Sequence, residues 1–128
     1  MTDAVLVLTS RLRAELTRAA KARKVADIAA LRSLLSALDN AGAQPAEEPA
    51  TVTEGPIAYA VEFGQAEVAR RVVSVAEAGQ IVAAEIAQRR QQSQLLDQAG
   101  RDVEAAVARS QAKLLARIAV DCDFSEVL

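Results

Sequence analysis

Apolar residues recur at helical spacing from the start of the chain, and this periodicity constrains the fold more than any other feature of the sequence. In the first segment they follow one another at steps of three or four residues, which places them on one face of a helix running to about residue 23. This face consists of Val5, Leu8, Leu12, Leu16 and Ala19. Thr2 and Asp3 can cap the start of the helix. The chain is therefore expected to begin with an amphipathic helix.

A second apolar stripe follows at once and includes the segment ALRSLLSALDNA, residues 30–41. The stripe consists of Ile28, Leu31, Leu34, Leu35 and Leu38. Asn40 and Gly42 are typical signals for the end of a helix. Residues 1–42 should therefore form a helical hairpin.

Two more helices are predicted in the second half of the chain. Ser74 and Glu77 have the spacing of a capping box, so a helix should begin at Val75, and Gly100 should end it. Its predicted inner face consists of Ala78, Ile81, Val82, Ile86 and Leu96. A last helix is predicted from apolar residues at steps of four, seven and four, which are Val103, Val107, Leu114 and Ile118. Helices joined by such short turns pack antiparallel.

Composition supports a helical fold. Hydrophobic residues make up 52% of the 128 residues but aromatic residues only 2%, so the core must be built from aliphatic side chains and alanine. Alanine, leucine, glutamate, glutamine and arginine are strong helix formers. Residues 57–72 keep a helical spacing that Gly64 interrupts, which indicates a short or broken helix. The predicted fold is all-α, an antiparallel bundle of about four main helices plus one short broken helix.

The chain divides into four regions. The hairpin of residues 1–42 is followed at residues 43–56 by a linker that holds all three prolines, two adjacent glutamates and no periodicity, as is typical of a flexible segment. Residues 57–120 should complete the same bundle. Residues 121–128 form an acidic tail.

Several kinds of chemistry are missing from the sequence. The chain has no histidine, which excludes a His-based general base, a Ser-His-Asp triad and most zinc sites. Its single cysteine, Cys122, lies between Asp121 and Asp123, whose charges disfavour a thiolate. We therefore predict no catalytic, cofactor-binding or metal-binding residues. The apolar run of residues 4–8 is too short to cross a membrane, and the lone cysteine fits a reducing cytoplasm.

Charge is distributed unevenly, although the net charge is only −2. Residues 1–32 carry seven basic and three acidic side chains, whereas residues 39–69 carry six acidic and no basic ones. A basic face of the first two helices would attract an anionic partner. Its candidate residues are Arg11, Arg18, Lys21, Arg23, Lys24 and Arg32. The alternative is that these side chains are ordinary solvated charges, some of which complement the negative end of the first helix.

A second candidate site is a polar cluster between helices. Glu85 and Arg89 are four residues apart, a spacing that suits an ion pair on a helix surface. Turned inward, the same pair would meet Arg32 and Asp39 of the second helix. Arg32 also has a simpler reading, in which its stem lies along the edge of the core and its guanidinium stays in water.

Two long segments resemble the YqeY-like family, also described as the GatB/YqeY domain. The first is LRAELTRAAKARKVADIAALRSLLSALDNA, residues 12–41, with a basic helix end followed by a leucine-rich helix. The second is AEVARRVVSVAEAGQIVAAEIAQRRQQSQLLDQAGR, residues 66–101, in which Glu85 and Arg89 occupy recurring acidic and basic positions. The resemblance covers most of the chain between Leu12 and about Ile118.

The resemblance implies an all-helical protein related to the tail region of the B subunit of the tRNA-dependent Asp/Glu amidotransferase. That enzyme converts mischarged tRNA to its amide form with glutamine as amido donor. The tail lacks the amidase nucleophile and the kinase-like site, so the implied role is a non-catalytic accessory whose partners are tRNA or amidotransferase subunits. Two features depart from the family pattern: the last helix continues into ARIAVDCDFSEVL, so the usual C-terminal helical subdomain is not expected, and the acidic linker is long.

A different class of function is an interaction or oligomerisation module without a nucleic-acid role. The side chains of Val5, Leu6, Val7 and Leu8 cannot all point into one core, which favours a protein partner or a homo-oligomer. An enzyme is the weakest hypothesis, and glutamine hydrolysis by the isolated chain would be needed to support it.

Overall fold

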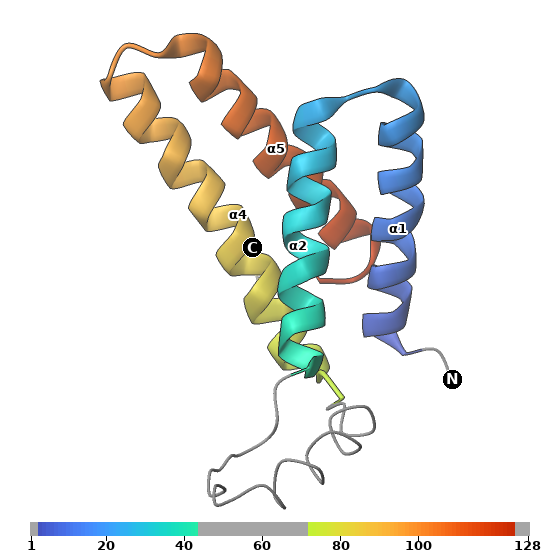
Figure 1. Ribbon diagram of the computed structural model, residues 1–128. Helices are drawn as coiled ribbons and strands as arrows, with labels where there is room; N and C mark the ends of the chain where they lie inside the picture. The colour runs from blue at the N-terminus through green and yellow to red at the C-terminus, as the bar shows by residue number, and fades with distance from the viewer. Residues whose placement is uncertain (1–2, 44–71, 125–128) are drawn as a thin grey trace, which may run out of the picture.

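The computed structural model describes residues 3–43 and 72–124. These residues form four helices, α1 (Ala4–Ala22), α2 (Val25–Ala43), α4 (Val75–Gln98) and α5 (Asp102–Asp121), and contain no strand. Consecutive helices run in opposite directions (Figure 1). The predicted all-α bundle of four main helices is therefore confirmed. All but the last residue of the expected broken helix, and all but the first residue of the expected linker, lie outside the described residues.

The ends of the helices follow the local signals in the sequence. The side chain of Asp3 accepts a hydrogen bond of 3.0 Å from the Val5 N–H, and Ser74 Oγ accepts one of 3.0 Å from the Glu77 N–H. Helix α4 begins at Val75 and is followed by Gly100, whose φ of 78° is in the left-handed region. The predicted caps and the predicted role of Gly100 are confirmed, because each depends on neighbouring backbone alone.

The core is built from aliphatic side chains of all four helices. Its largest fully buried members are Leu8, Leu12, Leu31, Leu34, Val82, Ile86, Leu115 and Ile118. Each such side chain contributes roughly 1.5–3 kcal/mol on burial. Small buried residues such as Ala30, Ala78 and Ala112 let the helices approach closely. Cys122 and Phe124 are also buried, so the chain just after α5 packs against this core.

The two hairpins, α1–α2 and α4–α5, diverge towards their turns. In Figure 1 the start of α4 lies beside the end of α2, whereas the turn between α4 and α5 stands away from the turn between α1 and α2. Val103 and Val107, at the start of α5, are therefore 79% and 42% exposed. Their helical spacing with Leu114 and Ile118 shows a shared face of α5 but not how far the neighbouring helix covers that face.

The apolar start of the chain is also divided between core and solvent. Leu8 is fully buried, whereas Leu6 and Val7 are 62% and 40% exposed. The expectation that these residues cannot all face one core is confirmed. No helix in residues 3–43 and 72–124 is long and apolar enough to cross a membrane.

Candidate nucleic-acid interface

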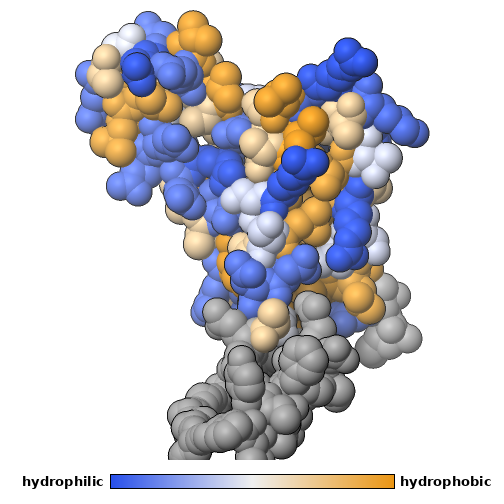
Figure 2. Space-filling view, viewed as in Figure 1, coloured by the Kyte–Doolittle hydropathy of each residue, from blue (hydrophilic) through white to orange (hydrophobic). Residues whose placement is uncertain are grey.

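Three of the six predicted basic residues gather at the turn between α1 and α2. Lys21 lies in the last turn of α1, Arg23 is its C-cap residue and Lys24 precedes α2. All three side chains are exposed and have no hydrogen bond or ion pair with any described residue. Figure 2 shows hydrophilic side chains at this end of the α1–α2 hairpin. Their charges are therefore available to an anionic partner, although Lys21 also complements the negative end of α1.

Arg11 belongs to a structural ion-pair network instead. Its Nε lies 2.9 Å from Glu15 Oε2 and its Nη2 lies 3.0 Å from Asp121 Oδ2, which ties α1 to the end of α5. These hydrogen bonds, first to Glu15 and then to Asp121, raise the pKa of the Arg11 guanidinium. Two carboxylates thus balance its charge, and Arg11 has little left to offer an external anion.

Two more cations lie near those of the turn, Arg18 of α1 and Arg117 of α5. Arg18, 68% exposed, lies 3.7 Å from Glu15 Oε2. Together with Lys24 and Arg117 of α5 it lines a pocket of about 120 Å³, whose wall also includes the carboxylates of Glu15 and Asp27. We call the surface formed by five cations the basic cluster: Arg18, Lys21, Arg23, Lys24 and Arg117.

The structure adds Arg117 to the basic cluster and leaves Arg32 out of it. The sequence analysis did not select Arg117, because no local signal indicates that this part of α5 lies beside Arg18 and Lys24 of the α1–α2 hairpin. Arg32 is exposed about two turns further along α2 and does not line the pocket.

Of the four residues predicted to form a polar cluster between helices, the structure brings only Glu85 and Arg89 together. Glu85 Oε1 accepts hydrogen bonds from Arg89 Nη1 at 2.7 Å and from Ser33 Oγ of α2 at 2.9 Å. The side chains of Glu85 and Arg89 are only 14% and 12% exposed, and Arg89 Nε is buried without a hydrogen-bond partner among the described residues. Arg32 and Asp39 are exposed and make no ion pair with this cluster. Ser33, missed by the sequence analysis, is its contact on α2.

Cys122 is a buried thiol rather than a reactive one. Burial raises the pKa of the Cys122 thiol, the nearby Arg11 lowers it, and Asp121 and Asp123 raise it further. The flanking aspartates thus act in the predicted direction, but burial is the larger cause. In the described part of the chain no three Cys, Asp or Glu side chains are placed to hold a metal ion.

No family model, curated protein sequence or solved structure matches this chain significantly.

Proposed function

We propose that this protein is a non-catalytic helical module that binds the phosphate backbone of a structured RNA. The basic cluster carries this proposal, because four of its five cations have no ion pair with a described residue. Cations left unpaired at one end of a bundle attract a polyanion, and both lysine and arginine bind phosphate well. The resemblance to the YqeY-like family supports tRNA as the RNA and an accessory role in tRNA-dependent amidotransfer.

The mode of binding follows from the side chains around the cluster. Phe124 is buried, and it is the only aromatic residue in the described part of the chain. Stacking on bases would need exposed aromatic rings, so the contacts are made to phosphates and to the shape of the RNA. If all five cations contact phosphate, the logarithm of the affinity falls with the logarithm of the salt concentration with a slope of about −4.

Binding of the purified chain to total tRNA, measured at low and at physiological salt, tests this proposal. The informative variant replaces Arg18, Lys21 and Arg23 by glutamate, and we expect it to abolish binding. A matched control replaces Arg13, Arg32 and Arg90 by glutamate. These three side chains are exposed, have no ion pair with a described residue and lie on three different helices.

Each outcome decides the proposal. Binding by the control variant but not by the cluster variant supports it, since both carry the same change of charge. If both variants lose tRNA binding equally, the net charge alone attracts the tRNA. If both keep it equally, the basic cluster does not contact the tRNA. Either result overturns the proposal.

A second candidate function is a protein interaction module. Several large apolar side chains are exposed, among them Leu6, Val25, Leu95 and Val103. No binding to tRNA even at low salt, together with a stable complex with a protein, would favour this function.

A further inference from the structure

The apolar stripe of α5 continues beyond the point where α2 stops covering it. Val103, Val107, Leu114 and Ile118 share one side of the helix, since they are separated by steps of four, seven and four residues. Ile118 is fully buried and Leu114 packs against the core, whereas Val103 and Val107 are exposed. Where the hairpins separate, Gln111 Nε2 donates a hydrogen bond of 2.8 Å to the carbonyl of Ala26. The stripe thus has the pattern of a packed face but lacks a partner over its first half.

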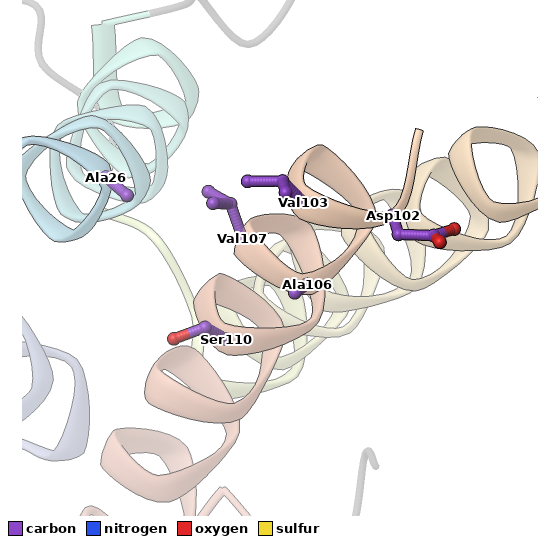
Figure 3. A pocket seen from close by; sticks show the side chains of 6 residues that line it. All are labelled: Ala26, Asp102, Val103, Ala106, Val107 and Ser110. Carbon is purple, nitrogen blue, oxygen red and sulfur yellow. The ribbon is translucent and has the colours of Figure 1, made fainter. Parts of the chain in front are cut away.

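This uncovered half lines an apolar groove of about 480 Å³. Its residues are Ala26, Asp102, Val103, Ala106, Val107 and Ser110. In Figure 3 the valine side chains point towards Ala26, and Asp102 points outwards at the opposite edge. Figure 2 shows the surface hollowed between the tip of the α4–α5 hairpin and the start of α2. Ala106 and Ser110 are small, so another helix can approach α5 closely here.

The charges beside the groove indicate which helix fits. Arg109 is paired with Asp97 at 2.8 Å and Arg101 with Glu104 at 3.4 Å. Asp102 and Lys113, in contrast, have no ion pair or side-chain hydrogen bond with any described residue. They are eleven residues apart, about three turns, so they lie on the same side of α5 at opposite ends of the exposed face. The exposed face of α5 therefore has apolar side chains along one edge and one free negative and one free positive charge along the other edge, away from the valines.

We propose that this face binds a second copy of the chain, with the two α5 helices antiparallel and crossing near Val107. In that arrangement Asp102 of each copy meets Lys113 of the other, and the apolar side chains from Val103 to Ser110 of both copies meet in the centre. A two-fold interface requires a surface that complements itself, and opposite charges three turns apart along one edge of the exposed face of α5 meet that requirement. A parallel arrangement would place like charges together, so the charges also select the antiparallel one.

The experiment uses the full chain and measures its molecular mass by sedimentation equilibrium from micromolar to millimolar concentration. We expect a monomer–dimer equilibrium. Val107→Asp should weaken the dimer at least about tenfold, because it places a charge in the apolar centre. The monomer should keep its helical circular dichroism, since Val107 is already 42% exposed.

Mixing two charge variants tests the register. Asp102→Lys alone and Lys113→Asp alone should each weaken self-association at least about tenfold, because each homodimer then contains two like-charge pairs. An equimolar mixture of the two should dimerise again, since every pair in the heterodimer is of opposite charge. A monomer at all concentrations overturns the proposal, even if the groove proves to hold a helix of another protein. A dimer that these variants leave unchanged, or whose loss mixing does not restore, overturns it as well.

Discussion

Ser33 and Glu85 are joined by a hydrogen bond of 2.9 Å that links α2 to α4 across 52 residues of sequence. Among the described residues, Glu85 is at the same time the only carboxylate that pairs with the nearly buried Arg89. One oxygen of Glu85 thus accepts a hydrogen bond from a hydroxyl of the first hairpin and another from a guanidinium of the second. A partly buried charge is costly when its partner is lost, so this contact is expected to matter more than the ion pairs on the surface.

Glu85→Ala should lower the free energy of unfolding by about 2 kcal/mol, because it leaves the Arg89 guanidinium nearly buried without its counter-charge. Urea denaturation measures the loss. Asp97→Ala is the matched control. The Asp97–Arg109 ion pair has a similar distance, 2.8 Å against 2.7 Å, but both of its side chains are 47% exposed. The control should cost about 0–1 kcal/mol. Equal losses in the two variants would contradict the importance given to burial.

The Cys122 thiol should make stability depend on pH in the alkaline range. Burial raises the pKa of this thiol, so the folded chain keeps the proton at pH values where the unfolded chain loses it. This contribution to stability is complete below the unfolded pKa of a thiol, about 8.5, and is lost as the pH rises above it.

The measurement is the difference in unfolding free energy between the wild type and Cys122→Ala, determined by urea denaturation at pH 7 and pH 10. The variant removes the thiol but leaves every other titrating group in place. The advantage of the wild type should shrink at pH 10. A difference that stays constant would show that folding does not perturb the thiol.

Local signals in the sequence predicted the secondary structure well. Asp3, Ser74 and Gly100 act on backbone within a few residues, so each could be assigned before any packing was known. The core positions of α1 and α2 followed from spacing for the same reason, because a helix with one apolar stripe has one way to bury it.

The relationships between helices could not be predicted in the same way. Spacing placed Arg32 and Asp39 on one helix and Glu85 on another, but the register between the helices decides that Ser33 makes the contact. The approach of Arg117 to Arg18 and Lys24 depends likewise on how α5 crosses the α1–α2 hairpin. The divergence of the hairpins, which exposes Val103, is a property of the whole bundle. Candidate site residues were therefore found where they share one helix and missed where two helices must meet.

The cap of α4 should be worth about 1 kcal/mol. Ser74→Ala removes the acceptor of the Glu77 N–H, which then lacks this partner at the start of the helix. Ser36→Ala is the control, because Ser36 is exposed within α2 and has no side-chain hydrogen bond with a described residue. The control should be neutral or slightly stabilising, since alanine is the better helix former. Thermal unfolding followed by circular dichroism would refute the cap if both variants had the same midpoint.

Gly100 and Arg23 both adopt left-handed backbone after a helix, with φ of 78° and 58°, and substitutions at the two turns should act in opposite directions. A Cβ added at Gly100 would meet no atom within 4 Å, so Gly100→Ala tests backbone strain alone. It should cost about 1 kcal/mol, because the left-handed conformation brings a Cβ too close to the following carbonyl. Arg23→Gly relieves the same strain and should stabilise the chain by about 0.5 kcal/mol, since the greater freedom of glycine in the unfolded chain offsets part of the gain. Urea denaturation measures the free energy of unfolding of both variants. If both variants lose stability, or both gain it, side-chain contacts and not backbone conformation govern these turns.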